Sequence, residues 1–146
     1  MKRHLAFSTV LVTLLVLSGC SLFAPSTEEL TVAFQDLASG MSKAKTNALT
    51  NPSATDAVYA LSFATTGTYT STYKFTNYAG SVYTLNGTVT GTFTSLTGPV
   101  TMSGSLTLTG GAISTLVLDY TSSGDALSGT MTANGFVYDA STLKLK

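Results

Sequence analysis

The chain of 146 residues has no tryptophan, a single cysteine and a single histidine, and only 10% of its residues are charged. The histidine, His4, and the one arginine, Arg3, both lie within the first four residues. Because Cys20 has no second cysteine to pair with, a disulfide framework is impossible and the fold must be held by packing. Zinc and copper sites built on histidine and cysteine are equally excluded.

Residues 1–19 have the organisation of a secretory signal. Lys2 and Arg3 supply the positive charge, residues 5–17 are almost wholly apolar, and the small residues Ser18 and Gly19 follow. The apolar run is too short for a transmembrane helix, which needs about 20 residues. We therefore expect a segment that is removed.

The stretch Leu17-Ser18-Gly19-Cys20 resembles the lipobox of bacterial lipoprotein precursors. The resemblance implies cleavage between Gly19 and Cys20 and a lipid on the Cys20 sulfur and amino group. It also implies a place in the cell envelope. This is the outer membrane, on its periplasmic or surface face, in a host with two membranes, and otherwise the outer leaflet of the cell membrane. Residues 20–25 are then a short tether, and residues 26–146 a single domain. An ordinary signal with an unrelated cysteine is the alternative.

Cleavage before Cys20 also removes His4 and Arg3. Five lysines and seven acidic residues remain. Neither a histidine nor a free thiolate is left as a general base, and no arginine is left for phosphate recognition. We expect no enzyme, no metal, no cofactor and no nucleic-acid partner. Asp119 and Asp125, which flank one predicted turn, are the carboxylates to check, although solvated turn residues are the simpler interpretation.

The segment Ser26-Thr27-Glu28-Glu29 fits a capping box, the start signal of a helix. Apolar residues then recur every three or four positions, at Leu30, Ala33, Phe34, Leu37, Met41, Ala44 and Ala48. This spacing predicts an amphipathic helix over about 26–49, ending before Pro52. Gly40 within it indicates a close approach to another element or a break.

We expect strands over the rest of the chain, about 58–144, because apolar residues alternate with threonine and serine within 65–132. We expect strands at about 69–76, 81–95, 100–109, 112–121, 126–133 and 136–144. Short turns between them require antiparallel neighbours. The predicted fold is α+β, with the N-terminal amphipathic helix packed on a curved antiparallel meander sheet. A closed or half-closed β-barrel around the helix is the alternative.

A weak repeat places a glycine two residues before an apolar residue in three strands, at Gly87, Gly104 and Gly129. We expect a strongly coiled sheet in which these glycines form a shallow groove on the apolar face, and we expect the helix to pack across it through Ala33, Leu37 and Gly40. The opposite face is nearly all threonine and serine. A solvated surface and an adhesive one are both compatible with it.

Aromatic side chains crowd one predicted hairpin and form a candidate ligand or partner face: Tyr69, Tyr73, Phe75, Tyr78 and Tyr83. The alternative is that they bury their rings and leave their hydroxyls in water.

The leading hypothesis is an envelope lipoprotein with a structural or protein-interaction role, held on the membrane through Cys20. The alternative is a binder or carrier of an apolar ligand in the concave face of the sheet. A concave face filled by the helix favours the first, and one that holds a cavity favours the second. Long strands with little charge protect their edges poorly, so the anchor-free domain should self-associate unless the sheet closes.

Overall fold

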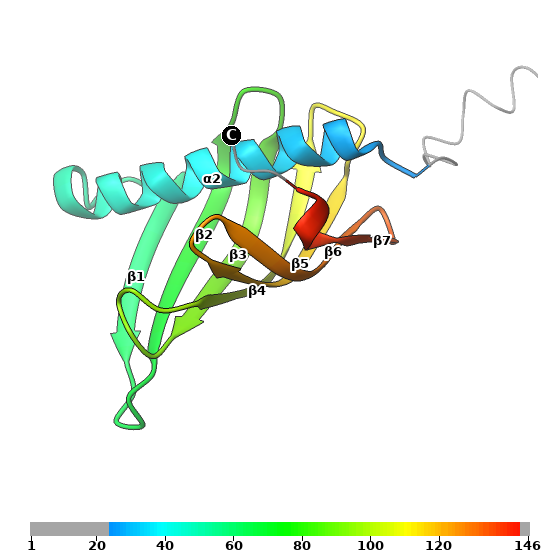
Figure 1. Cartoon of the computed structure of the whole chain (residues 1–146). Helices are drawn as coiled ribbons and strands as arrows, with labels where there is room; N and C mark the ends of the chain where they lie inside the picture. The colour runs from blue at the N-terminus through cyan, green and yellow to red at the C-terminus, as the bar shows by residue number, and fades with distance from the viewer. Residues whose placement is uncertain (1–23, 144–146) are drawn as a thin grey trace, which may run out of the picture.

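The computed structural model describes residues 24–143. The predicted cleavage and lipidation residues, Gly19 and Cys20, lie outside this range. One long helix, α2 (Thr27–Thr50), precedes an antiparallel sheet (Figure 1). The sheet consists of β1 (Ala57–Phe63), β2 (Tyr69–Ala79), β3 (Thr84–Phe93), β4 (Val100–Thr109), β5 (Thr115–Ser123), β6 (Ala126–Ala133) and β7 (Phe136–Asp139), followed by a 3₁₀ turn, η1 (Ala140–Thr142).

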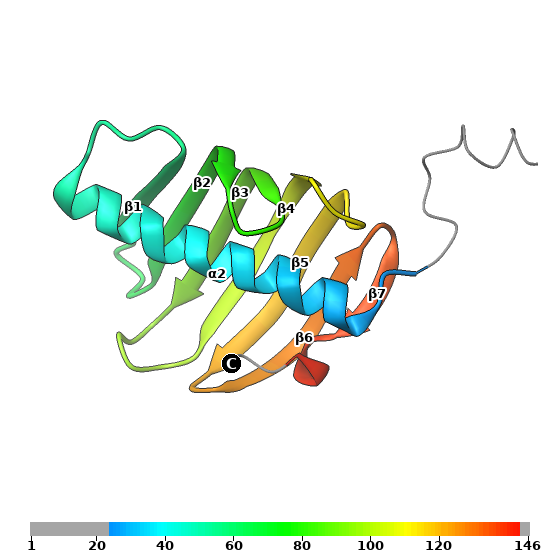
Figure 2. The ribbon, with the colours of Figure 1, turned by 90° about the horizontal axis from the view of Figure 1, so that it is seen from above.

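The seven strands pair in chain order, so the sheet is a simple meander with β1 and β7 at its edges. The predicted α+β fold is therefore confirmed. The closed-barrel alternative is wrong, because the two edge strands do not pair with each other. Figure 2 shows α2 lying obliquely across the curved sheet, with its first turns beside β6 and β7 and its last turns beside β1.

The predicted capping box is present at the start of α2. The Ser26 hydroxyl oxygen accepts a hydrogen bond from the Glu29 backbone N–H at 3.2 Å, and Glu29 Oε2 accepts one from the Ser26 N–H at 2.7 Å. The helix runs unbroken through Gly40. A Cβ there would lie 2.8 Å from Cε1 of Phe75 and 3.0 Å from Cε1 of Tyr78, so Gly40 marks the close approach of α2 to β2.

The six expected strands correspond to β2–β7, and two of them, β4 and β6, have the expected limits. The strand β1 was not singled out, because its sequence AVYALSF is almost continuously apolar and shows no clear alternation. The last strand is shorter than expected, because the Asp139 carboxylate accepts hydrogen bonds from Ser141 N and Oγ, at 2.8 and 2.7 Å. These bonds start the turn η1 and end the strand.

The core lies between the buried face of α2 and the concave face of the sheet. The rings of Phe34 on α2 and Tyr120 on β5 meet edge to face, with centroids 5.7 Å apart. The described core residues fall between Leu30 and Leu143. A chain of residues 21–146 therefore keeps all of this core.

The three repeated glycines allow the expected coiling of the sheet, but α2 is not among their nearest neighbours, so the expected helix-packing role is wrong. Gly87, Gly104 and Gly129 have φ angles of +132°, +151° and +110°. A Cβ at each would come within 2.4–2.5 Å of a backbone carbonyl oxygen of the neighbouring strand. The atoms nearest to them belong to the sheet and not to α2, so these glycines permit the strands to coil closely.

Candidate functional site

The helix covers only part of the concave face. The strands β1–β3 extend past it, away from α2 (Figure 1). At this end the concave side of β1 carries Leu61 and Phe63, whose side chains are 50% and 60% exposed. Leu61 and Phe63 lie on the same side of β1 as the buried Ala57, whereas Val58 and Ala60 lie on the convex side. The apolar face of the sheet is thus longer than the helix that packs on it.

A cavity of about 410 Å³, here called the groove, lies between α2 and this uncovered end. Its lining is Met41, Lys45, Tyr59, Leu61, Ser71, Tyr73, Phe93, Leu96, Val100, Met102, Tyr120 and Ser122. A second hollow of about 280 Å³ adjoins it and shares Met41, Lys45 and Tyr120. The lining comes from the helix, from β1–β5 and from the β3–β4 loop, so only the folded sheet assembles it.

Three neighbouring aromatic rings continue the apolar surface next to the groove, the first pair tilted and the second pair stacked. Phe63, Tyr69 and Phe93 are direct neighbours across β1, β2 and β3. The Phe63 and Tyr69 centroids are 4.7 Å apart, and those of Tyr69 and Phe93 are 5.2 Å apart with the planes within 10° of parallel. Such pairs hold each other in place and present one continuous aromatic surface.

Among residues 24–143, Lys45 is the one charged residue that lines the groove and the adjoining hollow, and no acidic side chain of this range lines either. Its Nζ lies 5.8 Å from the centroid of the Tyr73 ring, within cation–π range. Tyr73 and Tyr120, which are 3% and 5% exposed, both line the groove. Burial, with a smaller contribution from Tyr73, raises the pKa of Tyr120 to about 12, so its hydroxyl stays protonated at neutral pH.

The structure separates the five aromatic residues that the sequence singled out. Tyr73 lines the groove, and Tyr69 stacks on Phe93, which also lines it. Phe75 and Tyr83 are buried in the core. Tyr78 packs against Phe75 and lines a different hollow, near the other end of the helix-covered sheet.

Several residues of the groove, and Phe63 beside it, were not predicted from the sequence. Leu61 and Phe63 lie on the strand that was not singled out, and Phe93 ends a strand whose predicted limits were too wide. Lys45 follows the buried Ala44 on the polar side of the helical pattern, so nothing in the sequence connected it with the sheet. The only available signal was the continuous apolar run of 57–61.

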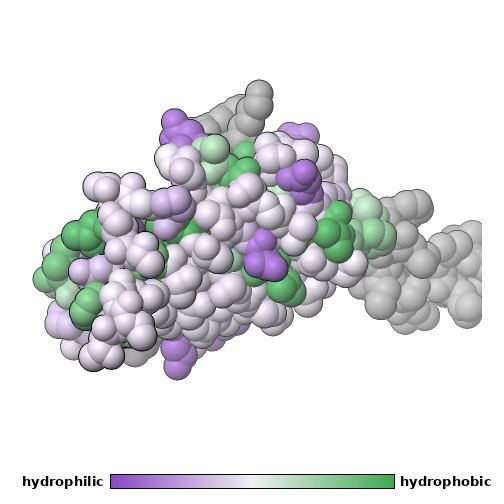
Figure 3. Space-filling view, turned by 60° about the horizontal axis from the view of Figure 1, so that its bottom comes forward, coloured by the Kyte–Doolittle hydropathy of each residue, from purple (hydrophilic) through white to green (hydrophobic). Residues whose placement is uncertain are grey.

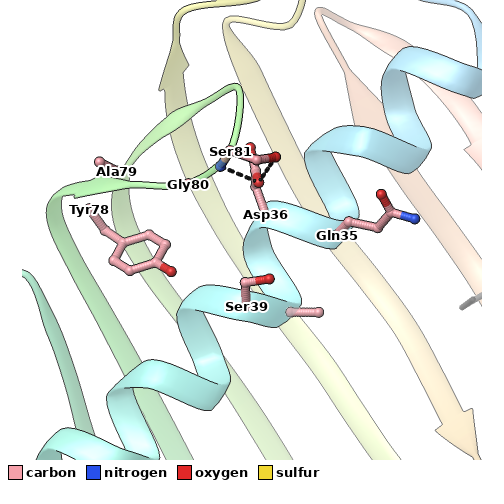
Figure 4. Close-up of a pocket in the computed structure, with 8 residues that line it drawn as sticks. Gln35, Asp36, Ser39, Tyr78, Ala79, Gly80 and Ser81 are labelled. Carbon is pink, nitrogen blue, oxygen red and sulfur yellow. Dashed lines mark hydrogen bonds between the residues drawn. The ribbon is translucent and has the colours of Figure 1, made fainter.

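The other hollow, of about 470 Å³, lies beside Asp36 of α2 and the β2–β3 loop (Figure 4). The Asp36 side chain accepts four hydrogen bonds. Ser81 N and Oγ donate to Oδ1 at 2.7 and 2.6 Å, and Val82 N and Tyr83 N donate to Oδ2 at 2.9 and 2.8 Å. Burial acts to raise the pKa of this carboxyl, but the hydrogen bonds from Ser81, Tyr83 and Val82 together outweigh it and hold the pKa below its ordinary value.

Asp36 is therefore an ionised carboxylate whose lone pairs are already occupied. It has no proton to donate near neutral pH and no free position for a ligand. We assign it a structural role, that of fixing the β2–β3 loop on the helix.

The two carboxylates that flank the predicted turn are exposed. Asp119 lies on the convex face of β5, and Asp125 lies in the turn before β6. Within residues 24–143, no group of three or more histidine, cysteine, aspartate or glutamate side chains could hold a metal ion. In the same range, no helix is both long and apolar enough to cross a membrane.

The convex face carries the threonine and serine side chains. Cross-strand hydroxyl pairs form on it, between Thr90 and Ser103 and between Thr101 and Thr121, each at 3.1 Å. Figure 3 shows one side of the molecule, on which weakly polar residues predominate and strongly hydrophilic ones are few and scattered.

Comparisons of the chain with models of protein families, with curated proteins and with solved structures found no match. The functional conclusion therefore depends on the geometry of the site.

Proposed function

We propose that the protein is a non-catalytic lipoprotein of the bacterial envelope, tethered through Cys20, that binds an apolar ligand in the groove. The observation that carries the proposal is that α2 leaves one end of the concave face open. The groove of about 410 Å³ falls within the roughly 300–1,000 Å³ of typical small-molecule sites.

The composition of the groove supports a ligand with a large apolar part. Contiguous exposed apolar surface on a soluble domain marks a binding site more often than a single exposed residue does. Here Leu61, Phe63 and the outer residue Leu96 are exposed beside buried aromatic rings. An apolar molecule that covers them gains roughly 25 cal/mol per Å² of surface removed from water.

The start of the domain is compatible with a short tether. The Tyr138 hydroxyl on β7 donates a hydrogen bond to the Pro25 carbonyl oxygen at 2.6 Å, which fixes the chain just before α2. Residues 20–24 span at most about 3.5 Å each, or about 18 Å in all. A lipid on Cys20 would therefore keep the start of the domain close to the membrane, where apolar molecules are abundant.

Binding can be tested with residues 21–146, which contain the described core. We expect a neutral dye that fluoresces in apolar surroundings, such as N-phenyl-1-naphthylamine, to bind at one saturable site. Leu61→Asp should abolish the binding, whereas Leu49→Asp, at an exposed helix position outside the groove, should leave it intact. A folded wild-type domain that binds no dye would overturn the ligand-binding proposal.

The anchor requires a separate test in cells. We expect the wild-type chain to incorporate an alkyne analogue of palmitate and to sediment with membranes. Cys20→Ala should lose the label and leave the membrane fraction, whereas Ser21→Ala should keep both. Membrane association that survives Cys20→Ala would contradict the lipobox assignment.

A second candidate function, protein interaction, is favoured by the open edge of β1. Thr76 N donates to Asp56 O at 2.9 Å and Ala64 N donates to Thr68 O at 2.8 Å. With the observed register, the even-numbered residues of β1 therefore make the backbone hydrogen bonds to β2. The backbone groups of Tyr59, Leu61 and Phe63 face away from the sheet, where an extended peptide could add as a strand.

This candidate is tested with a photo-cross-linking amino acid at position 61 or, as the control, at position 125. A protein partner predicts one product in intact cells, at position 61 only, that is lost when Phe63→Asp is added. Equal products at both positions would contradict it.

A further inference from the structure

We propose that the groove is built for a single-chain fatty acid, with the carboxylate of the ligand held by Lys45 and its chain lying along the aromatic end of the sheet. This inference rests on the proposed ligand-binding function. It adds the charge and the size of the ligand, neither of which follows from the apolar lining alone.

The charge of the groove is the first argument. An apolar cavity with one positive group and no carboxylate in its lining favours a ligand with one negative charge, because opposite charges attract each other. Lys45 is that group, and none of the other described residues that line the groove and the adjoining hollow is charged. Lys43, two residues earlier on the helix, is also exposed but lines neither cavity.

The second argument is the polar atoms that line the groove together with Lys45. Tyr73 and Tyr120 are more than nine-tenths buried and line the groove. Their hydroxyls make no hydrogen bond to other residues within 24–143, whereas Ser71 Oγ, in the same lining, is bonded to the Gly91 carbonyl oxygen at 3.1 Å. Within residues 24–143 no fully buried side-chain oxygen or nitrogen atom lacks a hydrogen-bond partner, so these two hydroxyls remain accessible although their rings are buried. Both can therefore donate a hydrogen bond to a carboxylate in the groove.

The size of the cavity is the third argument. About 410 Å³ is near the lower end of the usual range for small-molecule sites, which suits one acyl chain and not two. Besides Lys45, the groove is lined by Tyr73, Phe93 and Leu96. The neighbouring rings of Phe63 and Tyr69 extend this apolar surface beyond Phe93. A chain placed this way covers the exposed apolar residues of β1 and of the β3–β4 loop.

The test is a displacement assay with residues 21–146 and cis-parinaric acid, a fluorescent fatty acid. Oleate, oleyl alcohol and oleylamine have the same chain and differ in charge. We expect oleate to compete best and oleylamine worst. Lys45→Gln should weaken oleate about tenfold and leave oleyl alcohol unchanged. Lys43→Gln is the matched control and should change neither.

The outcomes separate this inference from the proposed function. If the three competitors act equally, or Lys45→Gln leaves oleate binding unchanged, the charge assignment is wrong although the groove still binds apolar molecules. If lysophosphatidate displaces the probe better than oleate does, the ligand is not a carboxylate. If neither the probe nor the neutral dye binds the folded domain, the proposed function fails as well.

Tyr73→Phe and Tyr120→Phe give an independent readout. Each variant should weaken oleate more than it weakens oleyl alcohol, because a carboxylate accepts stronger hydrogen bonds than a hydroxyl does. Circular dichroism and thermal melting establish that each variant is folded. Equal effects on both ligands would overturn the placement of the carboxylate.

Discussion

Asp36 and Ser81, 45 residues apart in sequence, are joined by two hydrogen bonds, from Ser81 N and Oγ to the same carboxylate oxygen, at 2.7 and 2.6 Å. Asp36 is 2% exposed. A Cβ at Gly80 would lie 2.5 Å from Asp36 Cγ, so only glycine fits beside the carboxylate. This contact fixes the helix at the covered end of the sheet, opposite the end at which the groove opens.

Asp36→Asn is expected to lower the free energy of unfolding by about 2–3 kcal/mol. The substitution leaves four donors around a neutral amide, and hydrogen bonds to a buried charged group are worth about 1.5–3 kcal/mol. Urea denaturation followed by circular dichroism measures the change. Asp125→Asn, in an exposed turn, is the control and should be nearly neutral. An unchanged midpoint for Asp36→Asn would contradict the role assigned to this carboxylate.

The same carboxyl predicts a specific loss of stability in acid. Its pKa in the folded protein lies below its ordinary value, which is about 3.9 in an unfolded chain. The stabilisation is therefore fully present above about pH 4 and disappears as the pH falls through the folded pKa. The melting temperature of the wild type should fall more steeply between about pH 4 and pH 2 than that of Asp36→Asn.

Asp139 must be considered in that comparison. Hydrogen bonds from Ser141 also lower the pKa of its carboxyl, and both proteins retain it. The difference between the two curves therefore reports Asp36 alone. Parallel curves would show that Asp36 does not titrate with folding.

Gly104→Ala is expected to be strongly destabilising, by more than about 2 kcal/mol. The backbone has φ +151°, and the new Cβ would lie 2.4 Å from the Thr88 carbonyl oxygen, which no rotamer change can relieve. Gly98→Ala serves as the control, because its Cβ has no contact closer than 3.3 Å. Thermal melting of the two variants should separate them clearly. A stable Gly104→Ala domain would show that the strands can coil without this glycine.

The open edge predicts that residues 21–146 self-associate as their concentration rises. The strand β1 carries no charge and no proline, the usual protections of an edge. Sedimentation velocity should show oligomers of the wild type and monomers of Leu61→Lys. The matched substitution Leu49→Lys, at an exposed helix residue away from the edge, should leave the oligomers unchanged. Wild-type monomer at high concentration would contradict the prediction.

Much of the fold could be predicted because its signals are local. Ser26 and Glu29 specify the helix start within one turn of chain, and Asn134-Gly135 gives the β6–β7 turn, where both residues have positive φ. The limits of β4 and β6 follow from alternation and flanking turns. The strand β1 could not be identified in this way, since an apolar run without alternation fits a strand or a buried helix segment equally well.

The candidate site was predictable only in part, because its residues are neighbours across strands. Tyr69 and Tyr73 belong to the aromatic set predicted from the sequence. Tyr69 and Tyr73 lie in or beside the groove whereas Phe75 and Tyr83 are buried in the core, and this difference depends on how much of the sheet the helix covers. The repeated glycines were correctly expected in a coiled sheet, but they were wrongly expected to form the surface on which the helix packs. Their φ angles and the carbonyl oxygens beside them arise from strand pairing, which no single segment contains.

The sequence by itself determined the α+β class, the meander order and the shortage of catalytic side chains, because turn signals, periodicity and composition act over a few residues. It also carries the lipobox, from which the anchor on Cys20 is proposed. Only the tertiary structure decided that the sheet stays open, that Asp36 holds the β2–β3 loop and that Lys45 stands over Tyr73. All three features depend on how the sheet coils and on how much of its concave face the helix covers. Both are set by contacts between segments that are far apart in the sequence.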